Sequence, residues 1–133
     1  MLRKQTSKLP PWILSILTVA LILWLTLAPD PLGDDSPRLF PGADKVAHAI
    51  MFGFLTVVQL LDRQRRQEWK RLDRPIVWTA AAFSTLLGIA IEFIQLSMGM
   101  GRGFEVADMV ADAVGSAICA LLWLWWQRHW SLP

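Results

Sequence analysis

The sequence predicts an all-α integral membrane protein, a four-helix bundle, from its composition, its apolar segments and the charges between them. Of the 133 residues, 54% are hydrophobic, more than a soluble domain of this size needs. Four segments have the roughly 17 to 25 predominantly apolar residues that a helix needs to cross a bilayer core. The connecting segments differ in charge, which is expected to give the chain a defined orientation in the membrane.

The four predicted spans each have a recognisable beginning or end. Four prolines between residues 29 and 41 end the first span, and Pro75 suits the first turn of the third. The second span is the least apolar, because it begins with Lys45 and His48. A cleaved signal peptide explains the first span less well, since its apolar run is too long and no small-residue cleavage site follows. The predicted spans are residues 12–28, 45–61, 76–98 and 106–126.

One membrane domain, residues 12–126, is therefore expected between a basic tail, residues 1–11, and a short tail, residues 127–133. The N-terminal tail carries three basic residues, and residues 62–74 carry six. Residues 29–44 contain four acids and one arginine. Because basic loops stay on the cytoplasmic side, both termini are predicted to be cytoplasmic.

The net charge of +2 does not indicate a nucleic-acid-binding protein. Its basic residues are grouped between apolar segments and do not form a continuous surface, so membrane lipids are the expected partners. The lone cysteine, Cys119, excludes an internal disulfide and a cysteine-rich metal site.

Ionisable residues in three of the predicted spans fall in one layer near the outer surface. At 1.5 Å per residue, Glu92 and Asp112 lie about 9 Å below that surface and His48 about 5 Å below it. Helical spacing places Glu92 and Gln95 on one stripe with Gly88. Such residues usually pair with one another or line a wet cavity, so an outward-facing polar pocket is predicted.

The pocket hypothesis assigns roles by residue type. His48, Glu92 and Asp112 are the candidate catalytic residues, because imidazole and carboxylate groups transfer protons. The candidate ligand-binding residues are Asp44, Lys45, Gln95, Arg102 and Asp108. An architectural explanation stays open: Asp44 would cap its helix, Lys45 would reach the interface, and Glu92 would pair with Lys45 or Arg102.

At these residues the sequence resembles the VanZ-like family of small bacterial membrane proteins. The resemblance covers about residues 44–126 and depends on "DKVAH" opening the second span, "EFIQ" near the end of the third, and "GRGFEVADMVADAVG" leading into the fourth. It implies a multi-pass protein of the bacterial plasma membrane. The name-giving member is associated with reduced sensitivity to the glycopeptide teicoplanin, so the resemblance also implies a role in the cell envelope.

Three functional hypotheses follow, and the sequence does not decide whether the protein is an enzyme. The first is an enzyme acting on a lipid-linked or cell-wall precursor, although no nucleophile motif accompanies His48. The second is a non-catalytic binding or scaffolding protein that uses the same pocket. A small transporter subunit is less favoured, because the ionisable residues occupy one half of the membrane and no inverted repeat is visible.

No cofactor or metal is assigned from the sequence. His48, Glu92, Asp108 and Asp112 are suitable ligand types, but their spacing matches no established metal motif. Ion pairing with Lys45 and Arg102 is the favoured explanation of these groups. Ala107, Ala111 and Gly115 form a ridge of small residues that suits packing within the bundle or within a homo-oligomer.

Overall fold

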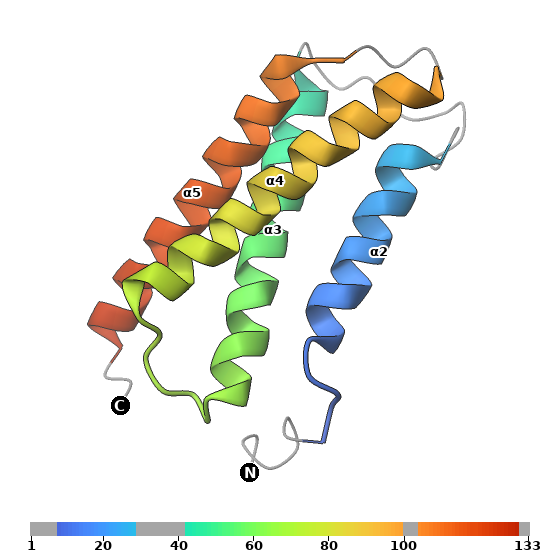
Figure 1. Cartoon of the computed structure of the whole chain (residues 1–133). Coiled ribbons are helices and arrows are strands. Elements are labelled where there is room, and N and C mark those ends of the chain that lie inside the picture. Colours follow the sequence, from blue (N-terminus) through green and yellow to red (C-terminus); the bar gives the residue numbers. More distant parts are fainter. Residues whose placement is uncertain (1–7, 29–41, 100–103, 131–133) are drawn as a thin grey trace.

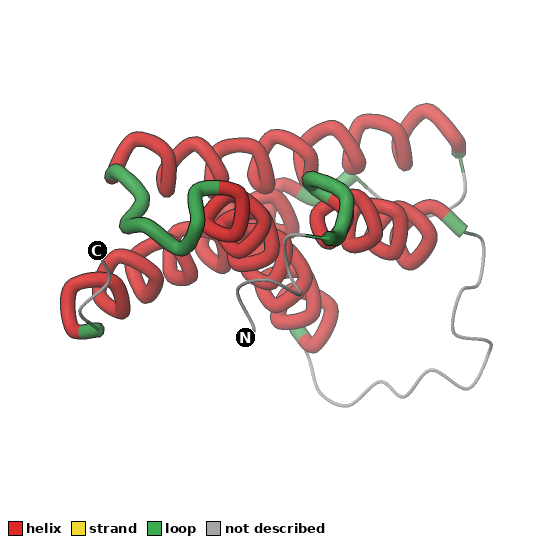
Figure 2. Tube along the Cα trace, turned by 90° about the horizontal axis from the view of Figure 1, so that it is seen from below, coloured by secondary structure: helices red, strands yellow, loops and turns green. Residues whose placement is uncertain are grey.

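Four helices make up the part of the chain that the computed structural model describes, which comprises residues 8–28, 42–99 and 104–130. Figure 2 shows helices and loops throughout these ranges and no strand. The all-α fold predicted from the sequence is therefore confirmed. The helices are α2 (Ile13–Leu27), α3 (Ala43–Arg66), α4 (Arg74–Met98) and α5 (Val106–His129).

Three helices are long and apolar enough to cross a membrane, namely α3, α4 and α5. They contain 24, 25 and 24 residues, so each is about 36 Å long at 1.5 Å per residue. Helix α2 is also apolar but contains only 15 residues. Large apolar side chains are exposed along the outer surfaces of the bundle, among them Ile50, Phe54, Leu86 and Leu121. Such surfaces would promote aggregation in water and are suited to contact with lipid.

The helix boundaries extend beyond several of the predicted spans. Helix α3 begins at Ala43 and continues to Arg66, past the predicted end at residue 61, and α5 continues to His129. Hydropathy marks where a segment leaves the apolar region, whereas helical hydrogen bonding continues into polar sequence. Helix α4 has proline in its first turn, as predicted, and Gly99 follows its last residue in a left-handed conformation typical of helix ends.

The core of the bundle forms mainly where α5 packs against α3 and α4, with α2 lying against α3 and making fewer contacts with α4. Small residues permit the closest approach. A Cβ atom on Gly115 of α5 would collide with the backbone of Ala49 in α3, and one on Gly53 would lie 2.8 Å from Sγ of Cys119. The predicted use of Gly115 in packing within the bundle is therefore observed.

The first and last described residues lie at the same end of the bundle, next to the connection between α3 and α4 (Figure 1). That end is rich in basic residues, including Arg63, Arg66, Arg71 and Arg128. At the opposite end α3 begins, α4 ends and α5 begins. The predicted polar layer lies there.

Candidate functional site

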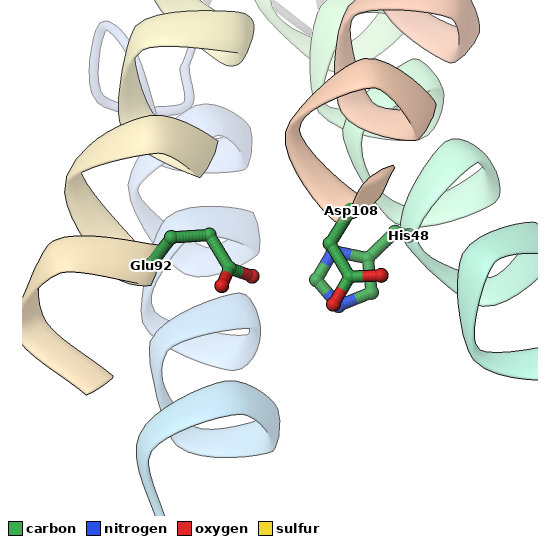
Figure 3. A group of neighbouring side chains, drawn as sticks. All are labelled: His48, Glu92 and Asp108. Atoms are coloured by element: carbon green, nitrogen blue, oxygen red, sulfur yellow. The ribbon is translucent and has the colours of Figure 1, made fainter. Parts of the chain in front are cut away.

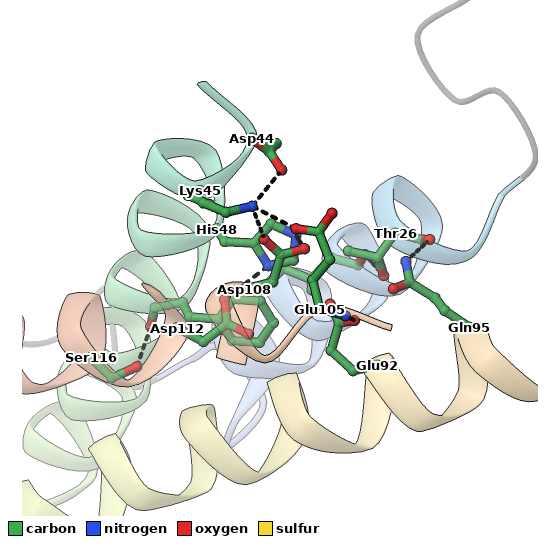
Figure 4. Close-up of polar contacts among 12 residues, drawn as sticks. Thr26, Asp44, Lys45, His48, Glu92, Gln95, Glu105, Asp108, Asp112 and Ser116 are labelled. Carbon is green, nitrogen blue, oxygen red and sulfur yellow. Dashed lines mark hydrogen bonds and ion pairs between the residues drawn. The ribbon is translucent and has the colours of Figure 1, made fainter. Parts of the chain in front are cut away.

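Helices α3, α4 and α5 bring a cluster of ionisable side chains together at the end of the bundle where α3 and α5 begin (Figure 4). In the sequence these residues are up to 68 positions apart, as Asp44 and Asp112 show. We call this group the acidic cluster. Its members are Asp44, Lys45, His48, Glu92, Glu105, Asp108 and Asp112.

Lys45 connects the first turn of α3 to the beginning of α5. Its ammonium group donates hydrogen bonds to Glu105 at 2.5 Å, to Asp108 at 3.1 Å and to Asp44 at 3.1 Å. These three contacts match the three donors of an ammonium group. Lys45 is one of the candidate ligand-binding residues, and binding an anion at its ammonium group would therefore require the displacement of a carboxylate.

His48 lies one turn further along α3 and faces two aspartates of α5. Its Nδ1 is 2.9 Å from Oδ1 of Asp112, a hydrogen-bond distance. Its Nε2 is 3.7 Å from Oδ2 of Asp108, which is too long for a hydrogen bond. With Asp112 accepting the proton of Nδ1, the lone pair of Nε2 is left available to a ligand or a proton.

Glu92 enters the cluster from α4 and is almost fully buried, with 1% of its surface exposed. One carboxylate oxygen, Oε2, accepts a hydrogen bond from the backbone N–H of Glu105 at 3.2 Å. The other oxygen, Oε1, is buried without a hydrogen-bond partner. Neither Lys45 nor any other cationic side chain of the described residues lies within ion-pairing distance of this carboxylate.

Asp112 is fully buried at the junction of the three helices. Its Oδ1 contacts His48, whereas its Oδ2 has no hydrogen-bond partner. Gly88 of α4 lies directly against this carboxylate, and a Cβ atom there would lie 2.9 Å from its Cγ. The glycine in α4 therefore provides the space in which Asp112 faces His48.

Most of the residues selected from the sequence meet in this cluster. Gln95 does not: its side-chain amide donates to the backbone carbonyl of Thr26 at 2.7 Å, so it ties α4 to α2 (Figure 4). Arg102 lies outside the described residues. Lys45 bonds Glu105 and Asp108, and it forms no pair with Glu92.

Glu105 is the member of the cluster that the sequence reasoning missed. It precedes the first residue of α5 and lies between the third and fourth predicted spans. Its side chain bonds Lys45 and its backbone N–H bonds Glu92, so it joins the two halves of the cluster. Its position three residues before Asp108 could have revealed it, because residues three apart lie on the same face at the start of a helix.

The cluster has an excess of negative charge among the described residues. Five carboxylates, from Asp44, Glu92, Glu105, Asp108 and Asp112, face one lysine and one histidine. Such a site attracts cations and hydrogen-bond donors such as hydroxyl and ammonium groups, and it repels an anion that arrives without a counterion.

Comparison with protein-family models matches residues 12–127 to VanZ/LLP1. The chain belongs to the VanZ/LLP1 family. The match covers α2, α3, α4 and all but the last two residues of α5, so the resemblance seen in three short motifs is confirmed for nearly the whole chain. No curated protein and no solved structure matched the chain in the corresponding searches.

Family membership and the apolar helices together describe a VanZ-like multi-pass membrane protein. The acidic cluster of this VanZ/LLP1 protein is built from the three motif regions that carried the resemblance. Asp44, Lys45 and His48 come from the first motif, Glu92 from the second, and Asp108 and Asp112 from the third. The motifs are thus far apart in sequence and contiguous in space (Figure 4).

Proposed function

We propose that this VanZ/LLP1 protein acts on the head group of a lipid-linked or cell-wall precursor at the outer face of the bacterial plasma membrane. The supporting observation is the pair formed by His48 and Asp112, which leaves Nε2 of the imidazole without a hydrogen bond. A carboxylate that fixes one nitrogen of a histidine orients the other for proton transfer. A histidine used only for packing would be expected to have both nitrogens satisfied.

The composition of the cluster favours a neutral or cationic part of such a head group. Hydroxyl groups of a sugar, or the amine of a peptide, would donate hydrogen bonds to carboxylates such as Asp108 and Glu105. His48 would then act as general base or general acid on the bound group, with Asp112 holding its ring. Glu92 would contribute a negative charge beside it.

A precursor attached to a lipid would reach the cluster from the bilayer. His48 is mostly buried, with 14% of its side chain exposed. It lies in the second turn of α3, near the end of the bundle and not at its centre. The lipid part would remain against the exposed apolar faces, where Ile50 and Phe93 are among the outward-facing side chains. The proposal thus includes a role in the cell envelope and, through the family, in tolerance to a glycopeptide antibiotic.

A second candidate function is non-catalytic binding or scaffolding, and the contacts of Lys45 favour it. Three carboxylates around one ammonium fix the beginning of α3 to the beginning of α5. A network of this kind can serve to hold a recognition surface in one shape. In this case the head group would be bound and released unchanged.

The test uses the purified full-length protein in lipid nanodiscs with a fluorescent lipid-linked peptidoglycan precursor. Wild type should bind the precursor saturably and convert it. His48→Ala should lower the conversion rate by at least about 100-fold, as loss of a general acid or base does. His129→Ala is the matched control, because this second histidine lies at the other end of α5 and should leave the rate unchanged.

The outcomes separate the two candidates. Saturable binding without conversion, weakened by Asp108→Asn, would support the binding function and exclude the catalytic one. If His48→Ala converts the precursor as fast as His129→Ala does, His48 has no catalytic role.

A further inference from the structure

We propose that His48, Glu92 and Asp108 bind one divalent transition-metal ion, such as Zn²⁺ or Mn²⁺. The three side chains come from α3, α4 and α5 and point toward the same space (Figure 3). One ligand atom from each lies within 4.8 Å of the other two. Ligands at about 2.0 to 2.2 Å from one ion lie at most about 4.4 Å apart. Small side-chain rotations would therefore bring all three into coordination.

The buried carboxylate of Glu92 is an independent indication of a cation. Its Oε1 has no hydrogen-bond partner, and the residue is 99% buried. An ionised oxygen in such a place is strongly destabilising when nothing compensates its charge. A metal ion between Glu92 and His48 would provide that compensation, and Figure 3 shows the carboxylate directed toward that space.

The contact between His48 and Asp112 is the arrangement that metal-binding histidines usually have. A histidine ligand commonly donates its second N–H to a carboxylate, which fixes its orientation and strengthens its basicity. Here Nδ1 is 2.9 Å from Asp112. Nε2 then faces Oδ2 of Asp108 at 3.7 Å, a separation that two ligands of one ion can have.

Asp108 can serve this site without giving up its contact with Lys45. Its Oδ1 accepts the hydrogen bond from the ammonium group, whereas Oδ2 faces His48. Asp44, Glu105 and Asp108 form another group of close carboxylates. That group surrounds the ammonium of Lys45, which already occupies the position of a cation. The metal is therefore assigned to the triad that contains His48.

The donor set selects the class of metal. One imidazole nitrogen with two carboxylates suits Zn²⁺ or Mn²⁺, whereas Ca²⁺ and Mg²⁺ prefer oxygen ligands throughout. Three protein ligands would leave coordination positions for water or for an oxygen of a ligand. An ion there would let the acidic cluster accept a phosphate-bearing head group, and His48, with Nε2 bound to the ion, would then hold the ion and would not itself transfer a proton. This last step rests on the binding of a precursor head group in the proposed function; metal binding itself does not.

Calorimetric titration of the full-length protein in detergent tests the proposal, with ZnCl₂, MnCl₂ and CaCl₂ as separate titrants after treatment with a chelator. We expect one Zn²⁺ or Mn²⁺ per chain. His48→Ala and Glu92→Gln should each weaken that affinity by more than 100-fold. Asp112→Asn, which changes only the partner of His48, should weaken it by about 10 to 100-fold. His129→Ala and Asp73→Asn are matched controls outside the cluster and should bind like wild type.

Three results would overturn the metal site. They are a wild type that binds neither Zn²⁺ nor Mn²⁺, a Ca²⁺ affinity equal to that for Zn²⁺, and an unchanged affinity in Glu92→Gln. The last variant keeps the shape of the side chain, so it provides an answer even if His48→Ala does not fold. Precursor binding by a wild type that takes up no metal would refute the ion and leave the proposed function intact. Metal uptake without precursor binding would refute the proposed function and leave the metal site intact.

Discussion

Glu92 shows how a single residue can conflict with the stability of its surroundings. Its carboxylate is buried, accepts one backbone hydrogen bond and has no lysine or arginine partner in the described part of the chain. Stabilising ion pairs in a low-dielectric region need both charges and further hydrogen bonds. The position is therefore better explained by a function than by packing, since functional groups are often kept at some loss of stability.

Glu92→Gln should consequently leave the metal-free protein as stable as wild type or make it more stable. The amide keeps the volume and an acceptor for the N–H of Glu105, and it removes an uncompensated buried charge. The measurement is the melting temperature in detergent with a chelator present. If Glu92 were structural, breaking its contact would instead destabilise the fold, by about 3 to 5 kcal/mol for a buried pair. A clear fall in melting temperature would thus contradict the functional interpretation.

At the scale of elements, the sequence was sufficient to predict the four helices and most of the residues that meet in the acidic cluster. Apolar length predicted each helix, and the helical rise per residue placed Glu92 and Asp112 at one depth. Two kinds of information were missing. The ends of α3 and α5 extend into polar sequence, which hydropathy does not mark. The partner of each polar group depends on how the helices rotate against one another, so the bond between Gln95 and Thr26 could not be foreseen.

Helix α2 is held at its N-terminal end by a buried carboxylate of α3. Oδ2 of Asp62 accepts hydrogen bonds from the backbone N–H and the hydroxyl of Ser15, each at 2.8 Å. Its Oδ1 pairs with Arg65 at 2.9 Å. Because α2 makes the fewest contacts in the bundle, this attachment should matter more than its apolar packing suggests.

Asp62→Asn should therefore lower the free energy of unfolding by about 3 kcal/mol, near the lower limit for a broken buried pair. The loss of stability is expected to be this small because Arg65 would keep its hydrogen bonds to the carbonyls of Leu9 and Pro10 and would not be left without partners. The measurement is denaturant unfolding in detergent. Asp73→Asn is the control: this exposed residue makes no side-chain cap for α4, and its change should stay within about 0.5 kcal/mol. Equal effects of the two variants would show that Asp62 does not anchor α2.

At the scale of the whole molecule, the two ends of the bundle carry opposite charge. The end with the connection between α3 and α4 is basic, whereas the other end holds the acidic cluster. Lysine- and arginine-rich segments remain in the cytoplasm during insertion. The charge distribution therefore predicts that the acidic cluster faces outward and that both termini are cytoplasmic.

Cysteine labelling in intact bacterial cells tests this orientation. In a Cys119→Ala background, a cysteine placed at Gly101, between α4 and α5, should react with a membrane-impermeant maleimide. A cysteine at Gln67, an exposed residue between α3 and α4, should react only after the cells are permeabilised. The reverse pattern would place the acidic cluster in the cytoplasmic half of the bilayer. The fold and the geometry of the metal site would survive that result, but an outer-leaflet precursor could no longer reach His48.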